Sequence, residues 1–120
     1  MNSKRKGKTG ELELAQIFRN NGYIEAKRGQ QYSGLNGDAD VVGVKGLHIE
    51  CKRCQQVRDE AFLQQAERDA RKGEIPAVFF RRNNEEWKVL QRLDTFLIIW
   101  NELTNEQKQN IHDKIKISVK

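Results

Sequence analysis

The segment from Gly37 to Lys52 constrains this chain most, because it combines the pattern of a β-hairpin with charges that a buried hairpin normally lacks. β-Branched residues fill the segment, and Lys45-Gly46 marks a turn between two short strands. The first strand opens with Asp-Ala-Asp, whereas the second ends with Glu-Cys-Lys. Where these charges point therefore decides what the hairpin can do.

The pairing register of the hairpin sets the direction of the charges. A three-residue loop over residues 44–46, with Gly46 in the left-handed conformation, places Asp40 opposite Glu50. Because side chains alternate along a strand, one face then carries Asp38, Asp40, His48, Glu50 and Lys52, and the other carries Val41, Leu47, Ile49 and Cys51. A two-residue loop would turn Asp40 away from Glu50. We favour the first register because it separates charged from apolar residues.

Two carboxylates directly opposite each other on a sheet repel unless something binds between them. A divalent cation resolves this repulsion, and Mg²⁺ takes one or two carboxylates while leaving its other positions to water and phosphate oxygens. Lys52 lies two residues beyond Glu50 on the same face, where it can hold or deprotonate an attacking water or neutralise charge on a phosphate. The pattern therefore predicts metal-assisted hydrolysis of a phosphodiester.

Asp40 followed by Glu50-Cys51-Lys52 resembles the PD-(D/E)XK nuclease superfamily and, within it, the small Holliday junction resolvase-like nucleases. The likeness spans about residues 8 to 82 and includes a helix Glu after a Gly, which Glu11 matches. Ala39 replaces the Pro usually found before the motif Asp, so Asp38 and Asp40 are both eligible. Asp40 is favoured because it lies opposite Glu50 and precedes the Val-Val of its strand.

The resemblance implies an α/β fold with a restriction-endonuclease-like core, in which a mixed central sheet is flanked by helices. It also implies a Mg²⁺-dependent endonuclease, with Mn²⁺ able to substitute, that cuts DNA and leaves a 5′-phosphate. The implied metal ligands are Glu11, Asp40, Glu50 and the carbonyl of Cys51. The implied catalytic residues are Glu11, Asp40, Glu50 and Lys52, with Asp38 and Gln65 as secondary candidates. A solvent-facing helix Gln is the alternative interpretation of Gln65.

Apolar periodicity predicts helices over residues 9–20 and 59–72, the second ended by Gly73. The inward stripe of the first helix consists of Leu14, Ala15 and Phe18, and Glu11 lies on that stripe. A carboxylate there is costly unless it is paired or bound to a metal. The alternative is an N-terminal acid favoured by the helix dipole.

The rest of the chain predicts further strands and helices around the hairpin. Strands are expected over residues 22–28, 75–80 and 87–90. Asp94 is the expected N-cap of a later helix, and Thr104 with Gln107 forms a capping box for the last one. The predicted order is helix, three strands, helix, two strands, then C-terminal helices over residues 94–120, which is an α/β arrangement.

The 120 residues are expected to form one domain, with residues 1–8 as a flexible basic arm. A formal net charge of +5 favours a polyanionic partner. The candidate DNA contacts, for which solvated side chains are the alternative, are Lys4, Arg5, Lys6, Lys8, Tyr32, Ser33, Arg53, Arg81 and Arg82. The apolar segment 96–100 suggests a symmetric homodimer, which would suit branched or junction-containing DNA. The chain shows neither a membrane span nor a signal peptide, so a cytoplasmic location is expected.

Three alternatives remain at this point. The first is a non-catalytic, basic nucleic-acid-binding domain that retains the nuclease fold, and the second is a nicking or flap nuclease of the same superfamily. The third is a zinc-held module that uses His48, Cys51 and Cys54, although Cys51 on the apolar face favours a small buried residue. Metal-dependent cleavage of DNA separates the first alternative from an enzyme, and stoichiometric zinc identifies the third.

Overall fold

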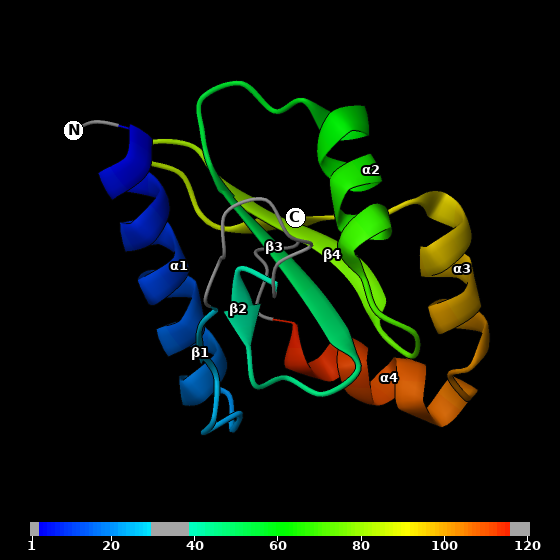
Figure 1. Ribbon diagram of the computed structural model, residues 1–120. Helices are drawn as coiled ribbons and strands as arrows, with labels where there is room; N and C mark the ends of the chain where they lie inside the picture. Colours follow the sequence, from blue (N-terminus) through cyan, green and yellow to red (C-terminus); the bar gives the residue numbers. More distant parts are fainter. Residues whose placement is uncertain (1–2, 30–38, 116–120) are drawn as a thin grey trace.

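The computed structural model describes residues 3–29 and 39–115. Its elements follow the predicted order (Figure 1) and are α1 (Ser3–Asn20), β1 (Lys27–Arg28), β2 (Val41–Val42), β3 (Leu47–Arg53), α2 (Asp59–Asp69), β4 (Ile75–Arg81), β5 (Lys88–Leu90), α3 (Leu93–Asn101) and α4 (Asn105–Lys114). The five strands form one sheet in the order β1-β2-β3-β4-β5. Only β3 and β4 pair in parallel, so the sheet is mixed.

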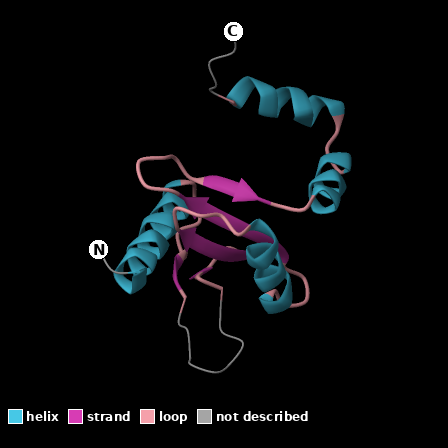
Figure 2. Ribbon diagram, turned by 90° about the horizontal axis from the view of Figure 1, so that it is seen from above, coloured by secondary structure: helices cyan, strands magenta, loops and turns pink. Residues whose placement is uncertain are grey.

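The central strand β3 separates two layers of helix. Its residues Ile49 and Cys51 are buried in the same cluster as Leu14 and Ala15 of α1. On the opposite face, Lys52 reaches α2. Helix α1 therefore covers one face of the sheet and α2 the other, as Figure 2 shows from above. This α/β arrangement confirms the predicted fold class and agrees with a restriction-endonuclease-like core.

The hairpin between β2 and β3 has the predicted register. Val41 pairs with Ile49, and the Asp40 N–H donates to the Ile49 carbonyl at 3.0 Å. Gly46 has a φ of 85°, in the left-handed region that a turn residue of this kind requires. Extending this register by one residue puts Asp40 opposite Glu50. Along β3 the predicted separation of faces is confirmed, because Ile49 and Cys51 pack on the side of α1 whereas Lys52 reaches α2.

Three predicted boundaries were wrong. Helix α1 begins at Ser3, so the basic residues assigned to a flexible arm form its first turns. Lys and Arg are good helix formers and no Pro intervenes, which explains why the helix extends past Gly10. The first strand is only Lys27–Arg28, because Gly22 adopts a φ of 100° and the chain turns at residues 21–25. Asp94 is not an N-cap: α3 starts at Leu93 after Arg92, and Asp94 lies in its first turn.

The C-terminal helices contribute no buried residue to the core. Figure 2 shows α3 and α4 standing apart from the three layers. Arg92, just before α3, pairs with Glu60 and Glu67 of α2 at 2.8 and 2.7 Å. The predicted capping box of Thr104 and Gln107 is confirmed at the start of α4. None of the described helices is long and apolar enough to cross a membrane.

Helix α1 approaches the end of β3 closely at Gly10. A Cβ at this position would overlap Cγ of Arg53, whose side chain crosses the helix there. The close approach explains why a glycine stands immediately before Glu11. It also brings the start of α1 beside the carboxyl end of β3.

Replacing Gly10 with alanine is therefore expected to destabilise the fold by about 1–2 kcal/mol, because the overlap with Arg53 outweighs the higher helix propensity of alanine. Gly7 lies in the same helix and has no other atom within 4 Å of such a Cβ. Gly7→Ala is the matched control and should stabilise by about 0.5–1 kcal/mol. Urea unfolding of the two variants measures both effects, and equal shifts would contradict the proposed contact.

Candidate active site

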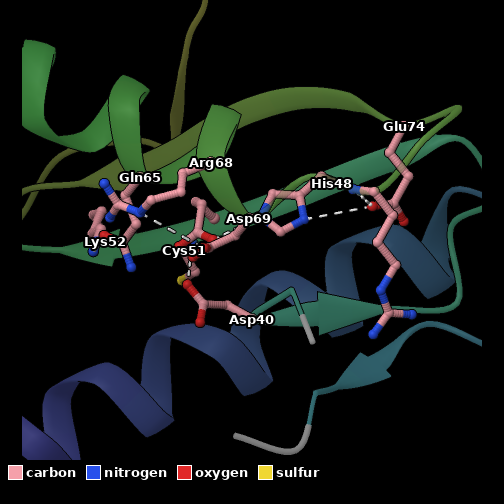
Figure 3. Close-up of polar contacts among 10 residues, drawn as sticks. Asp40, His48, Cys51, Lys52, Gln65, Arg68, Asp69 and Glu74 are labelled. Atoms are coloured by element: carbon pink, nitrogen blue, oxygen red, sulfur yellow. Dashed lines mark hydrogen bonds and ion pairs between the residues drawn. The ribbon is translucent and has the colours of Figure 1, made fainter. Parts of the chain in front are cut away.

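The centre of the site is a pair of buried carboxyl groups, Asp40 and Glu50, which are 6% and 3% exposed. The Cys51 N–H donates to Asp40 Oδ2 at 2.8 Å, and Figure 3 shows Asp40 beside Cys51. Burial, the charge of Glu50 and a hydrogen bond with the Glu50 side chain raise the pKa of Asp40 to about 7. Asp40 therefore tends to keep its own proton near neutral pH, and a cation between the two carboxyl groups could take the place of that proton.

A buried histidine holds one of these carboxylates. His48 Nε2 lies 2.7 Å from Glu50 Oε1, and Nδ1 lies 3.7 Å from Glu74 Oε1. Burial lowers the pKa of His48, but the hydrogen bond with Glu50 and the charges of Glu50, Glu74 and Asp69 more than offset this. The pKa of His48 is consequently raised above its ordinary value.

Lys52 is positioned by α2. Its Nζ donates to Gln65 Oε1 at 2.8 Å and lies 5.0 Å from the centre of the Phe62 ring. Figure 3 shows Gln65 extending from α2 toward Lys52. The interpretation of Gln65 as a solvent-facing residue was therefore wrong, since it fixes the position of the lysine ammonium group. Lys52 and Gln65 follow the carboxyl pair along the same face of the sheet.

Glu11 lies close to the pair but already has a partner. It is only 9% exposed, and its Oε1 accepts a hydrogen bond from Arg28 Nε at 2.6 Å. The negative charge of Glu11 contributes to the raised pKa of Asp40, which places it in the electrostatic surroundings of the site. Its neighbour Glu13 turns elsewhere and pairs with Arg81 at 2.9 Å.

The basic residues predicted to bind DNA divide into two groups. Arg53 donates to the Arg81 carbonyl, Arg81 pairs with Glu13, and Arg82 lies 3.5 Å from Glu85, so these three guanidinium groups have protein partners. The second group is on the first turns of α1 and consists of Lys4, Arg5, Lys6 and Lys8. Lys4 and Lys8 are exposed there. The candidates Tyr32, Ser33 and Asp38 lie outside the described residues.

The donor atoms at the centre suit a hard divalent cation. Within residues 3–29 and 39–115, no group of three or more His, Cys, Asp or Glu side chains could hold a metal ion. Mg²⁺ needs only one or two carboxylates and fills its remaining positions with carbonyl, water or phosphate oxygens. Asp40 and Glu50 offer two carboxylates and the Cys51 backbone offers a carbonyl, which are the donor types that such an ion takes. The proton that the raised pKa of Asp40 retains is what a cation would replace.

The alternative zinc site is not assembled. His48 lies on the α2 face of β3, whereas Cys51 is buried on the α1 face and packs with Val41 and Ile49. Alternation along the strand separates the two side chains. Burial raises the pKa of the Cys51 thiol, which disfavours the thiolate that zinc binds. Cys51 is the small buried residue that its place on the apolar face predicted.

Three partners of the site residues escaped the sequence interpretation. His48 was placed on the charged face, and its spacing from Glu50 was a usable signal, but it was considered only as a zinc ligand. The contacts of Glu74 with His48 and of Arg28 with Glu11 join residues from different elements. No local pattern marks such pairs.

Comparison with known proteins gives one family. A family model described as "Phage putative PDDEXK endonuclease" matches residues 2–120. Searches of curated proteins and of solved structures found no match.

Proposed function

Because this chain belongs to the phage PDDEXK endonuclease family whose model spans residues 2–120, we propose that it is a metal-dependent endonuclease that hydrolyses phosphodiester bonds in DNA. The observation that carries the proposal is the buried pair of Asp40 and Glu50 with Lys52 next along the same face. Burial beside Glu50 raises the pKa of Asp40 and destabilises the fold, and such costs are characteristic of functional sites.

Each residue of the centre has a proposed role. Asp40, Glu50 and the Cys51 carbonyl would hold Mg²⁺ or Mn²⁺, with Glu11 beside them. The bound cation supplies positive charge that offsets the charge developing on the phosphate. Lys52, held by Gln65, orients the attacking water and donates hydrogen bonds to the phosphate oxygens. Asp38 is retained as a secondary candidate for the acidic set.

The start of α1 is the proposed track for the DNA backbone. Lys4, Arg5, Lys6 and Lys8 lie in its first turns, with no acidic residue among them. Gly10 of the same helix lies against Arg53 at the end of β3, so the basic turns begin close to the strand that carries Glu50 and Lys52. Contacts of this kind bind phosphates without reading the base sequence and weaken steeply with added salt.

A symmetric homodimer is the proposed assembly, with α3 as the contact surface. Six apolar side chains of α3 are each more than a third exposed: Leu93, Phe96, Leu97, Ile98, Ile99 and Trp100. Their exposed surface would supply part of the ~800 Å² that each partner buries in a standard interface. Two copies joined in this way would present two centres to one branched DNA, which supports a preference for junctions like that of Holliday junction resolvases.

The substitution Ile98→Glu tests the assembly, because Ile98 is 66% exposed and its loss costs the monomer little packing. We expect the wild type to sediment as a dimer and the variant as a monomer with an unchanged melting temperature. Gln109→Glu on α4 is the matched control for added charge and should leave the dimer intact. A wild type that is monomeric at micromolar concentration would contradict the proposal.

The activity itself is tested with one panel of DNA: linear duplex, nicked duplex, flap and four-way junction of matched sequence. Cleavage is expected with Mg²⁺ or Mn²⁺ and not with EDTA, and the four-way junction should be cut fastest. If nicked or flap DNA is cut faster than the four-way junction, the chain is still an endonuclease but not of the resolvase subtype. Binding without metal-dependent cleavage of any form would instead identify a non-catalytic DNA-binding domain.

A further inference from the structure

His48 is the most buried polar side chain beside the carboxyl pair, with 1% of its surface exposed. Its ring lies between two acids, at 2.7 Å from Glu50 and 3.7 Å from Glu74. We propose that His48 is a positioning residue that orients Glu50 as a metal ligand. The inference rests on the proposed function, because it assumes that Glu50 binds the cation.

The geometry of β3 brings these two side chains together. Residues two apart in a strand share a face, so His48 and Glu50 lie next to each other on the side of α2. A carboxylate oxygen accepts, so His48 Nε2 donates to Oε1. That bond commits one oxygen of Glu50 and fixes the rotation of the carboxylate. Asp40 is held similarly by the Cys51 N–H, so both proposed ligands are oriented by donors of β3.

Packing alone gives no reason for a histidine at this position. Its neighbour across the parallel pair β3–β4 is Pro76, which offers an apolar surface and no side-chain hydrogen bond. A buried polar ring is costly unless its nitrogens are satisfied, and here the 2.7 Å partner is the carboxylate itself. An apolar side chain of similar size would fill the space without that cost. The hydrogen bond with Glu50 therefore explains why a histidine occupies this position.

The second ring nitrogen of His48, Nδ1, is directed toward Glu74. His48 and Glu74 both line a cavity of about 360 Å³ at the turn end of the hairpin. At 3.7 Å, Nδ1 is too far from Glu74 for a direct hydrogen bond, so the interaction is electrostatic. Glu74 is also the more exposed partner, at 28%. The effect of His48 on the site should therefore depend on its bond with Glu50 and little on Glu74.

The test compares His48→Met with His48→Gln. Methionine keeps the length of the side chain and removes the donor, whereas glutamine keeps an N–H near the place of Nε2. Partners that hold a metal ligand in place are typically worth 10–100-fold in metal affinity. We expect His48→Met to bind Mn²⁺ at least tenfold more weakly than the wild type in the absence of DNA. His48→Gln and Glu74→Gln should stay within about threefold, in keeping with the same principle.

Mn²⁺ affinity is measured by the electron paramagnetic resonance signal of free Mn²⁺, with circular dichroism as the check of folding and Asp40→Asn as the variant that lacks a ligand. If His48→Met binds Mn²⁺ as tightly as the wild type while Asp40→Asn does not bind it, this inference is wrong. The proposed metal site would still be supported. No binding by the wild type would overturn both. If His48→Met does not fold, Mg²⁺ titration of the wild type decides: the His48 Nε2–H nitrogen resonance should shift with saturation, and its constancy would overturn the inference.

Discussion

Lys52→Ala is expected to lower the turnover of metal-dependent DNA cleavage by about 10²–10³-fold, the usual cost of removing one group that stabilises a transition state. Lys52 carries a positive charge held by Gln65 at 2.8 Å, on the same face as the carboxyl pair. Under the proposed mechanism, the substitution removes the group that orients the attacking water and offsets negative charge on the phosphate. DNA affinity should change by less than about twofold, because the proposed phosphate contacts lie mainly on the first turns of α1.

Single-turnover cleavage and filter binding on the same DNA separate the two effects. Lys45→Ala is the matched control, because this exposed lysine lies at the opposite end of the same hairpin. It should leave turnover unchanged. The turnover of Gln65→Ala should fall between those of Lys52→Ala and Lys45→Ala, since this substitution releases the Lys52 ammonium group without removing it. Equal turnover of Lys52→Ala and Lys45→Ala would remove Lys52 from the reaction.

Asp40→Asn is expected to stabilise the metal-free protein while abolishing its response to metal. The pKa of Asp40 is raised from 3.8 to about 7 in the folded protein. The contribution of protonated Asp40 to stability is therefore complete below about pH 3.8, and it is lost as the pH rises through about 7. At pH 8 the wild type carries this destabilising charge and the variant does not. The gain in free energy of unfolding could approach about 4 kcal/mol and should shrink toward pH 4.

Urea unfolding at pH 8 and pH 4, with and without Mn²⁺, measures this prediction. Mn²⁺ should stabilise the wild type at pH 8 and have no effect on Asp40→Asn, which should also fail to cleave DNA. Glu86→Gln, which removes an exposed loop carboxylate, serves as the control. Its free energy of unfolding should depend on pH as that of the wild type does. A variant less stable than the wild type at pH 8 would show that the buried charge is not the dominant effect.

The hairpin could be predicted because its information is local. Alternation of apolar and charged residues, together with Gly46 at the turn, is enough to place Asp40 opposite Glu50. The stripes of α1 and α2 follow the same logic, since 3.6-residue periodicity is visible in the sequence. These local patterns account for the fold class and for the carboxyl pair.

The other contacts of the site could not be predicted, because they join segments that are distant in the sequence. Nothing near Gln65 in the sequence shows that it meets Lys52, and nothing near Arg28 shows that it pairs with Glu11. The first strand was overestimated because Tyr23 and Ile24 are apolar, yet they lie in an exposed turn after α1. Arg53, Arg81 and Arg82 suited phosphate contact by charge alone, but each has a protein partner. Local sequence patterns therefore could not predict contacts between side chains that only folding brings together.

The proposed mechanism requires one cation to bind between Asp40 and Glu50. The most direct measurement is an anomalous difference map from crystals grown with Mn²⁺, collected at the manganese edge. We expect one strong peak at coordination distance, about 2.0–2.2 Å, from a carboxylate oxygen of each residue. Well-ordered Asp40 and Glu50 side chains with no anomalous peak between them, at a Mn²⁺ concentration that supports cleavage, would contradict it.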